Sequence, residues 1–200
     1  MSPVTNEEIW KGKFGDEYTE RNKDAYKARW PFWDRFCRSW GFDSVLEVGC
    51  NVAPNIGMIS AIKENQKDVW GCDINANALW KGRRLEPGLN LVYASALDLP
   101  FQDEWFDFVF TAGVLIHLHP DSRERAMQEI IRVSNGYVGA IEYECPEFQE
   151  IKYRGLNNAL YKGPWGDIYE KRYGLRPVHK ERLRKDDGWD DCTFWLFAVR

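Results

Sequence analysis

Short apolar runs alternate with amphipathic segments through the middle of the chain. The apolar runs have the length of buried strands, and they are SVLEVG (44–49), DVWGCDI (68–74), NLVYAS (90–95), WFDFVFTAGVL (105–115) and GYVGAIEY (136–143). The segments predicted to be helices between them are 54–65, 75–85 and 120–133. Strands that alternate with helices predict a parallel sheet with helices on both faces.

Both ends of the chain extend this pattern. Residues 16–27 are predicted to form a polar helix, and residues 31–40 form a second helix with an aromatic face. Near the other end, residues 192–200 are apolar at both the odd and the even positions, which suits a strand covered on both faces. Residues 176–183 precede it across a turn at 186–188, so the sequence predicts an antiparallel hairpin that closes the parallel sheet.

A chain of 200 residues suits one globular domain. We expect residues 1–43 to form an N-terminal helical extension and residues 44–200 to form the α/β domain. Residues 144–166 interrupt the alternation directly after a predicted strand, at the end of the sheet where α/β proteins bind ligands. This insertion is expected to face the substrate, and an ordinary surface excursion is the alternative.

The composition narrows the class of partner. The net charge is −4 and there is no basic stripe, which argues against nucleic acid. No apolar run is long enough to span a membrane. Five scattered cysteines without a CxxC pair are typical of a reducing cytoplasm, and three separated histidines do not suggest a metal site. We expect a cytoplasmic protein with a small-molecule substrate and no metal; its oligomeric state stays open.

The segment EVGCNVAP joins the first predicted strand to its helix with fewer glycines than a nucleotide loop usually has. Gly49 permits a positive φ and a close backbone approach, Asn51 tolerates a positive φ, and Ala53 is the next-smallest residue where a third glycine would lie. Pro54 then begins a helix whose first N–H groups are free to bind a ligand. The loop can therefore still hold a nucleotide-like cofactor.

Acidic residues follow the first three strands. Glu47 would be unfavourable beside a phosphate and favourable beside an ammonium group, and Asp73 can accept hydrogen bonds from two ribose hydroxyls. Asp98 is predicted to accept a hydrogen bond from the amino group of adenine, with Ala96 and Leu97 beside it. Its alternative role is to cap a turn. These acids can bind an ammonium group and a ribose, and no basic residue is available for a phosphate. The pattern therefore indicates S-adenosylmethionine rather than NAD.

Four segments resemble the motifs of the class I S-adenosylmethionine-dependent methyltransferase family: EVGCNVAPN, GCDIN, SALDLPF and FDFVFTAGVLIHL. The resemblance implies a Rossmann-like, seven-stranded, mostly parallel sheet with a reversed final strand. It implies cofactor contacts for Glu47, Gly49, Asn51, Asp73, Leu97 and Asp98. Adjacent positions complete the predicted cofactor site: Cys50, Ile74, Ala96, Ala112 and Gly113. The chain departs from the family where Asn51 and Ala53 replace glycines.

A narrower resemblance covers most of the chain. The segments WKGKFGDEYTERN (10–22), EVGCN, GVLIHLHPD (113–121) and YRG (153–155) together resemble the methylases associated with pseudaminic acid biosynthesis. That resemblance implies an acidic, polyhydroxylated sugar as the methyl acceptor.

Methylation of a hydroxyl or a protonated amine also requires a proton acceptor. The candidates near the ends of the fourth and fifth strands are His117, His119, Glu142 and Glu144. His117 is preferred because histidine titrates near neutral pH, and a histidine bonded to backbone is its structural alternative. His119 precedes a proline and is expected at a helix entrance, where we count it with the substrate-binding residues.

The N-terminal extension is predicted to fold over the cofactor as a lid. Tyr18 would then lie near the methionine end and Arg21 would bind its carboxylate, whereas an ordinary Glu17–Arg21 pair on a solvated helix is the alternative. In the insertion, Arg154 is predicted to bind an acidic group of the substrate. Tyr153 and Trp165 are predicted to wall the substrate pocket, with plain packing as their alternative.

We therefore expect O- or N-methylation of a small, polar, acidic sugar. Two alternatives stay open: an NAD-dependent oxidoreductase on the same fold, and a non-catalytic module that binds S-adenosylmethionine. An amino-methyltransferase of DNA or RNA is disfavoured because no (D/N)PP(Y/F/W) segment follows the fourth strand.

Overall fold

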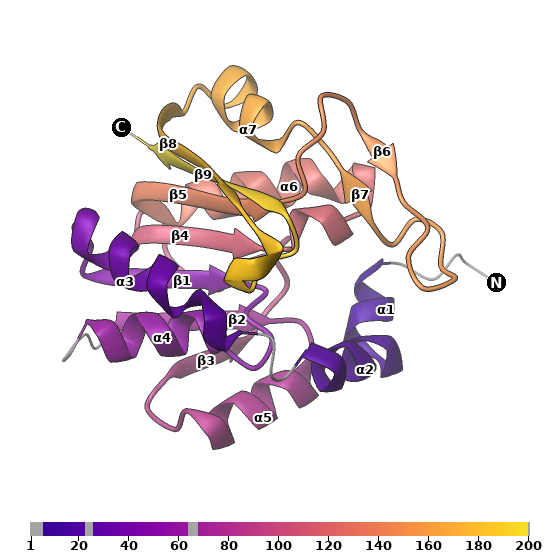
Figure 1. Cartoon of the computed structure of the whole chain (residues 1–200), viewed down its shortest axis with the longest axis horizontal. Helices are drawn as coiled ribbons and strands as arrows, with labels where there is room; N and C mark the ends of the chain where they lie inside the picture. Colours follow the sequence, from indigo (N-terminus) through magenta and orange to yellow (C-terminus); the bar gives the residue numbers. More distant parts are fainter. Residues whose placement is uncertain (1–5, 23–25, 64–67, 200) are drawn as a thin grey trace.

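The computed structural model describes residues 6–22, 26–63 and 68–199. Its centre is a seven-stranded sheet in the order β3-β2-β1-β4-β5-β9-β8 (Figure 1). The strands are β1 (Ser44–Val48), β2 (Asp68–Asp73), β3 (Asn90–Tyr93), β4 (Phe106–Ala112), β5 (Ser134–Glu142), β8 (Arg176–Leu183) and β9 (Cys192–Ala198). Strand β9 pairs antiparallel with β5 and β8, and the pairs among β1 to β5 are parallel. The predicted Rossmann-like sheet with one reversed strand is confirmed.

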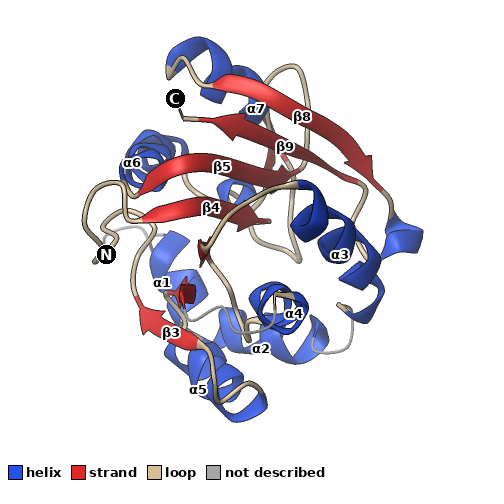
Figure 2. Cartoon of the chain, turned by 90° about the vertical axis from the view of Figure 1, so that its left-hand side faces the viewer, coloured by secondary structure: helices blue, strands red, loops and turns tan. Residues whose placement is uncertain are grey.

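Helices cover both faces of the sheet (Figure 2). The helices α3 (Trp30–Ser39) and α4 (Pro54–Ile62) pack into one core cluster, and α6 (Pro120–Arg132) packs into the other with α7 (Trp165–Asp167) and η3 (Ile168–Arg172). Helix α5 (Ala76–Leu85) packs on β2 and β3 at the edge of the sheet. The aromatic face predicted for residues 31–40 is buried in the first cluster, where Phe32, Trp33 and Phe36 contact sheet residues such as Phe108.

The C-terminal hairpin agrees with its predicted strand boundaries. Strands β8 and β9 flank η4 (Lys185–Asp187), and Gly188 ends that turn with a φ of 80°. All seven residues of β9 are buried, as expected for a strand that is apolar at both odd and even positions. This hairpin brings residues 188–191 to the end of the sheet where β1 and β4 also end.

Two further segments project beyond that end of the sheet. At the N-terminus are α1 (Asn6–Lys11) and α2 (Lys13–Asn22), followed by η1 (Lys27–Arg29); the predicted helix 16–27 thus begins earlier, and its residues 23–25 lie outside the described residues. The insertion contains a small hairpin of β6 (Gln149–Glu150) and β7 (Tyr161–Lys162). Figure 1 shows both segments on the side toward which the β4 arrow points.

Candidate active site

A cavity of about 410 Å³ lies at the carboxyl ends of the central strands. Its walls come from α1 and α2, from the loops after β1, β2, β3 and β4, from the end of β5, from the insertion and from the β8–β9 turn. Strand β1 lies between β2 and β4, so the cavity is at the point where the strand order reverses. Open α/β sheets bind ligands at this place.

The loop after β1 has the backbone that its sequence predicts. Gly49 and Asn51 have positive φ values of 77° and 52°, and Ala53 also has a positive φ, of 64°. The amides of Gly49 and Cys50 both donate to the carbonyl of Cys72, at 2.8 and 2.9 Å, which fixes the loop on β2. The two non-glycine residues therefore adopt the left-handed conformation that this tight turn requires.

Glu47 lies at the base of the cavity and is buried. Its Oε1 accepts a hydrogen bond from Asn55 Nδ2 at 2.7 Å, while Oε2 has no hydrogen-bond partner among the described residues. Burial raises the pKa of this carboxyl to about 8. A buried acid with an unused oxygen suits a cationic group, which would favour its ionised form.

Asp73 joins the loops after β1 and β2. Its Oδ2 accepts the amide of Asn51 at 2.8 Å, and its Oδ1 accepts the amide of Asn75 at 2.7 Å. Burial raises the pKa of the carboxyl, and these amide hydrogen bonds oppose the rise. Each carboxylate oxygen can accept a further hydrogen bond, so Asp73 can still bind ribose hydroxyls.

Asn75 connects the cofactor loops to the N-terminal helices. Its Oδ1 caps α5 by accepting the amide of Ala78 at 2.8 Å. Its Nδ2 donates to the carbonyl of Trp10 at 3.1 Å and to the carboxylate of Asp16 at 3.0 Å. The segment predicted as a lid is therefore attached directly to the loop that follows Asp73; that this segment moves stays a prediction.

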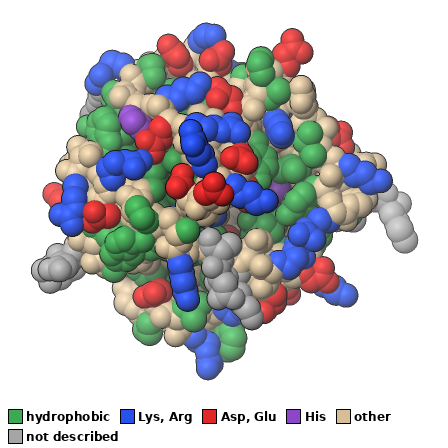
Figure 3. All heavy atoms as spheres, in the orientation of Figure 1, with side chains coloured by type: hydrophobic (Ala, Val, Ile, Leu, Met, Phe, Trp, Pro, Cys, Tyr) green, Lys and Arg blue, Asp and Glu red, His purple; other side chains and the backbone are tan. Residues whose placement is uncertain are grey.

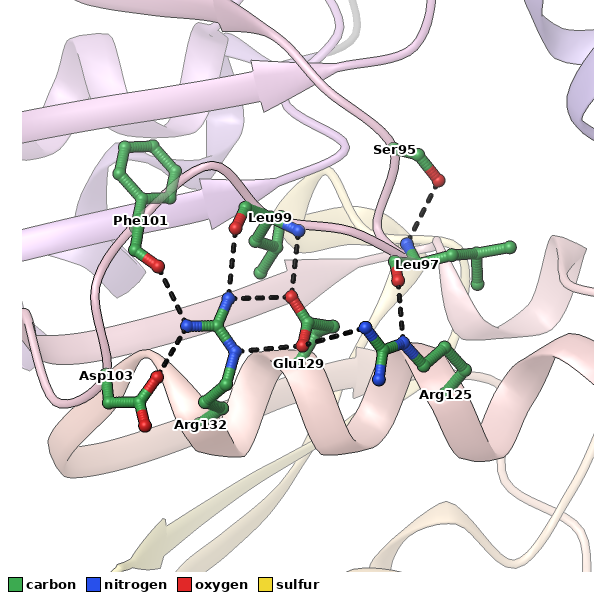
Figure 4. A network of polar contacts seen from close by, with 8 residues as sticks. All are labelled: Ser95, Leu97, Leu99, Phe101, Asp103, Arg125, Glu129 and Arg132. Carbon is green, nitrogen blue, oxygen red and sulfur yellow. Dashed lines mark hydrogen bonds and ion pairs between the residues drawn. The ribbon is translucent and has the colours of Figure 1, made fainter.

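The loop after β3 is held by side chains of α6 (Figure 4). Glu129 accepts the amide of Leu99 at 2.9 Å, and Arg132 donates to the carbonyl of Leu99 at 3.0 Å. Arg132 and Glu129 also pair with each other at 2.7 Å, and Arg125 donates to the carbonyl of Leu97 at 2.9 Å. The backbone of this loop, rather than its own side chains, makes most of these contacts.

Two residues predicted to contact the cofactor lie outside the cavity lining. Ala94 and Ala96 line the cavity, but Leu97 and Asp98 do not. Asp98 is exposed in a turn in which its amide donates to the carbonyl of Ser95 at 3.1 Å, and its contact with adenine stays a prediction. The predicted cofactor residues that do line the cavity are Glu47, Gly49, Cys50, Asn51, Asp73, Ile74, Ala96, Ala112, Gly113 and Tyr18.

Glu142 lines the cavity and holds the loop after β4. Its Oε1 accepts hydrogen bonds from the Thr111 hydroxyl at 2.8 Å and from the amides of Val114 and Leu115 at 3.1 and 3.2 Å. Its Oε2 accepts the amide of Ile116 at 3.3 Å. Burial raises the pKa of this carboxyl to about 7. Four donors that fix a loop leave Glu142 poorly placed to accept a proton from a substrate.

His117 ends η2 (Leu115–His117) and forms part of the cavity wall. Its Nδ1 lies 2.6 Å from the carbonyl oxygen of Ala159 in the insertion. Because a carbonyl can only accept, Nδ1 carries the proton and Nε2 carries the lone pair. Burial lowers the pKa of the imidazole to about 4, so the ring is neutral in the folded chain at neutral pH.

Two other predicted residues near the substrate lie outside the cavity. Glu144 is exposed and accepts hydrogen bonds from Lys180 and Thr193, because its strand end faces β8 and β9. His119 caps α6, with its Nδ1 3.4 Å from the amide of Asp121. Neither side chain lines the cavity, so the structure corrects both assignments.

Arg21 and Trp165 require the same correction. Arg21 lies 3.9 Å from Glu17 on the outer face of α2, which is the alternative that the sequence left open. Trp165 is fully buried, and its Nε1 donates to the carbonyl of Tyr143 at 3.0 Å, so it belongs to the core. The large apolar surface of the indole accounts for this burial.

The insertion places Tyr153 and Arg154 in the cavity wall. Tyr153 and Leu156 exchange backbone hydrogen bonds of 3.0 and 2.9 Å around a two-residue turn. Arg154 and Gly155 occupy that turn with φ values of 50° and 86°. Such a turn favours glycine or asparagine, so an arginine held in this strained conformation is a candidate for a functional role.

Three charged residues of the cavity were missed from the sequence: Glu7, Arg29 and Asp190. Arg29 lines the cavity, donates to the carbonyl of Gly188 at 2.8 Å and stacks on the ring of Trp189 at 4.1 Å. Asp190 lines the cavity from the β8–β9 turn. Arg29 could have been suspected as a basic residue just before the helix that begins at Trp30. Asp190 carries no such signal, because only the closure of the C-terminal hairpin brings it to the site.

Two absences hold within the described residues. No group of three or more histidine, cysteine, aspartate or glutamate side chains is arranged to hold a metal ion. No helix there has both the length and the apolar content needed to cross a membrane.

Residues 45–135 match a family described as "Methyltransferase domain". Among curated proteins, an uncharacterized protein of Haemophilus influenzae is 33% identical over 95 residues, which cover 44% of this chain and 37% of that protein. The tRNA (carboxymethyluridine(34)-5-O)-methyltransferase of Saccharomyces cerevisiae is 30% identical over 112 residues, which cover 56% of this chain and 37% of that protein. The match thus spans little more than a third of either relative.

Solved structures share the whole fold at low sequence identity. The putative methyltransferase in a complex with the Trm112 methyltransferase activator of Haloferax volcanii aligns with a TM-score of 0.73 at 12% identity, covering 99% of each chain. The magnesium protoporphyrin IX methyltransferase of Synechocystis with bound S-adenosylhomocysteine aligns with a TM-score of 0.71 at 11% identity, covering 96% of this chain and 97% of that one. Residues 45–135 are thus similar to a methyltransferase domain, and the whole chain shares its fold with solved methyltransferase structures.

Proposed function

We propose that this chain transfers a methyl group from S-adenosylmethionine to a small, polar, acidic sugar, at a hydroxyl or amino group. The observation that carries this proposal is the division of the cavity wall. Acidic residues gather at the ends of β1 and β2, whereas Tyr153 and Arg154 of the insertion line the other part. The first part suits a cationic cofactor and the second an anionic, hydroxylated acceptor.

The residues of the first part suit the cofactor. Glu47 offers an unused carboxylate oxygen to its ammonium group, and Asp73 offers two oxygens to its ribose. Arg29 replaces Arg21 as the candidate for its carboxylate, because the Arg29 guanidinium donates to Asn55 Oδ1 at 3.3 Å, and Asn55 in turn binds Glu47. When bound, S-adenosylmethionine supplies an electrophilic methyl group on its sulfonium, and these side chains fix its orientation.

The second part suits an acidic acceptor. Arg154 makes no ion pair among the described residues and stacks loosely on the Tyr153 ring, at 5.9 Å. A guanidinium that is free of protein partners can bind a carboxylate through two parallel hydrogen bonds. This is the chemistry that a nonulosonic acid sugar would require, which agrees with the resemblance to the methylases associated with pseudaminic acid biosynthesis.

A nucleic-acid acceptor is the second candidate, because the relative from Saccharomyces cerevisiae is named as a tRNA methyltransferase. The site itself favours the small acceptor. The cavity is walled on opposite sides by the N-terminal helices and the insertion. On the face seen in Figure 3, lysine and arginine side chains are interspersed with aspartate and glutamate rather than gathered in a basic stripe.

Two measurements test this proposal. Calorimetry with S-adenosylhomocysteine and with NAD should detect binding of the first alone; binding of NAD alone would return the site to the oxidoreductase alternative. A transfer assay should then offer N-acetylneuraminic acid, its CMP-activated form, UDP-N-acetylglucosamine and unmodified tRNA, with products read by mass. We expect one added methyl group on an acidic sugar. Transfer to tRNA alone would establish the second candidate, and cofactor binding without transfer to any probe would support a non-catalytic module.

A further inference from the structure

Five carboxylates line the cavity within the described part of the chain: Glu7, Glu47, Asp73, Glu142 and Asp190. Glu7 accepts a hydrogen bond from the hydroxyl of Ser95, and the next three hold the loops after β1, β2 and β4. Asp190 is different, because none of the hydrogen bonds or ion pairs of the described residues involves its side chain. Among these five carboxylates, Asp190 is therefore the one without a structural role.

Asp190 lies where four distant segments meet. It follows the buried Trp189 in the turn before β9. Burial raises the pKa of the Tyr26 hydroxyl to about 12, and the negative charge of Asp190 adds to that rise. Burial likewise raises the pKa values of Tyr18 in α2 and Tyr143 after β5, again with a contribution from Asp190. All four residues line the same cavity, and the pairing of Glu142 with Thr193 between β5 and β9 places Tyr143 next to the turn that carries Asp190.

Two of these phenols are available to a ligand. The hydroxyls of Tyr18 and Tyr143 form no hydrogen bond among the described residues, and both residues are only partly buried. A phenol donates one hydrogen bond and accepts others, so this pair can hold an oxygen of a sugar beside the Asp190 carboxylate. Asp190 is itself exposed, so a proton that it receives can pass on to solvent.

The other candidate proton acceptors are less suitable. Glu142 is saturated by four donors of the loop after β4. His117 has its Nδ1 proton committed to the Ala159 carbonyl and is fixed in the cavity wall by the rings of Trp10 and Tyr153, at 4.3 and 5.6 Å. Neither group combines an uncommitted basic atom with an open path to water.

We propose that Asp190 accepts the proton of the methyl acceptor, and that Tyr18 and Tyr143 hold the acceptor at that carboxylate. As the acceptor oxygen forms its bond to the methyl carbon, the carbon–sulfur bond breaks and its electron pair stays on sulfur. The hydroxyl proton passes to Asp190 and then to water. This inference rests on the proposed function, since it assigns the proton acceptor of that same transfer.

The test compares kcat, the acceptor KM and the affinity for S-adenosylhomocysteine in the wild type and three variants. Asp190→Asn keeps the shape and removes the basic oxygen, and Asp190→Glu restores a carboxylate. The control is Asp186→Asn, which alters an exposed acid of the same hairpin that does not line the cavity. The acceptor is whichever of the three sugar probes above the wild type methylates fastest.

We expect Asp190→Asn to lower kcat about 100-fold or more, with unchanged cofactor affinity and melting temperature. Asp190→Glu should recover part of kcat, and Asp186→Asn should match the wild type.

Asp190→Asn with wild-type kcat, or with a raised acceptor KM as its only effect, would overturn the assignment. If Asp190→Asn fails to fold, Asp190→Ser provides the same comparison with a smaller polar side chain. A wild type that methylates none of the sugar probes would remove the proposed function and this inference together, an outcome that differs from an active wild type with an equally active variant.

Discussion

The imidazole of His117 and the carbonyl of Ala159 are joined at 2.6 Å, and this contact connects the loop after β4 to the insertion. His117 lines the cavity, and Ala159 belongs to the insertion that supplies Tyr153 and Arg154 to the cavity wall. A neutral histidine thereby links the loop after β4 to the insertion. The same contact sets the tautomer of the ring, with its lone pair on Nε2.

We predict that His117→Ala slows turnover far more than it weakens binding of S-adenosylhomocysteine. The variant loses the link to Ala159, so the turn with Arg154 is no longer held against the acceptor, whereas the cofactor loops after β1 and β2 keep their contacts. Steady-state kinetics and calorimetry measure the two effects. Wild-type turnover in the variant would leave His117 with no part in the reaction.

The same substitution should change the pH dependence of stability. Burial lowers the pKa of His117 from 6.5 to about 4, so below pH 6.5 the unfolded chain binds a proton that the folded chain does not. The stabilisation by neutral His117 is therefore complete above pH 6.5 and is lost as the pH falls toward 4. Between pH 7.5 and pH 5, urea unfolding should show that the wild type loses about 2 kcal/mol more than His117→Ala. Equal losses in the two proteins would show that the ring is not buried as described.

Glu47 should make cofactor binding depend on pH in the neutral to mildly alkaline range. Its carboxyl has a pKa near 8 because of burial, so it is mostly protonated in the free chain at neutral pH. An ammonium group beside it favours the ionised form, so the affinity for S-adenosylhomocysteine should rise by up to about tenfold per pH unit as the pH approaches 8. Calorimetry in buffers of different ionisation enthalpy should detect a released proton. Glu47→Gln should bind weakly with no pH dependence; a wild type that releases no proton would place the ammonium group elsewhere.

Asp73→Ala should weaken S-adenosylhomocysteine binding by about 10- to 100-fold, as expected for the loss of charge-assisted hydrogen bonds to the ribose and to two loop amides. The matched control is Asp68→Ala, at the exposed start of the same strand. Calorimetry gives both affinities directly. An unchanged value for Asp73→Ala would remove this residue from the cofactor site.

The sequence predicts most of the cofactor loop because the loop is local. Gly49 and Asn51 have the positive φ values that their residue types allow, and the strand ends place Glu47 and Asp73 together. Asp98 shows the limit of such reasoning. Its position after β3 is right, but α6 holds its neighbours Leu97 and Leu99, and Asp98 itself is exposed.

The acceptor part of the cavity depends on contacts between distant segments. Asp190 reaches it only through the C-terminal hairpin, and Arg29 likewise meets the cofactor part through its contacts with Gly188 and Trp189 of that hairpin. Arg21 and Glu17 had a local alternative, an i,i+4 pair, and the local pair is what forms. Sequence spacing reports such pairs well, but it does not report which of several charged residues a tertiary fold directs into a cavity.

Arg154→Met should raise KM for an acidic sugar and leave KM for a neutral sugar unchanged, since it removes a guanidinium that no protein group pairs. The matched control is Arg182→Met, an exposed arginine of β8 that does not line the cavity. The two KM values are obtained with N-acetylneuraminic acid and a neutral hexose derivative. An equal rise for both sugars would argue that Arg154 shapes the pocket rather than recognising charge.

Arg132→Ala should destabilise the chain by about 3 kcal/mol, because it leaves the buried carboxylate of Glu129 with only the longer contact to the mostly exposed Arg125. Arg125→Ala is the matched control on the same helix. Its guanidinium is mostly exposed and lies 3.5 Å from Glu129, so its loss should cost about 1 kcal/mol or less. Urea unfolding measures both. Equal effects of the two substitutions would contradict the arrangement in Figure 4.

One asparagine side chain, that of Asn75, serves two neighbours with its two ends. Its oxygen caps the N-terminus of α5, and its nitrogen donates hydrogen bonds to Trp10 and Asp16 of the N-terminal helices. The same helices are also held by Thr19 on Asn51 and by Asp16 on Asn77, so a change at Asn75 would disturb the start of α5 together with one of several anchors of the N-terminal segment.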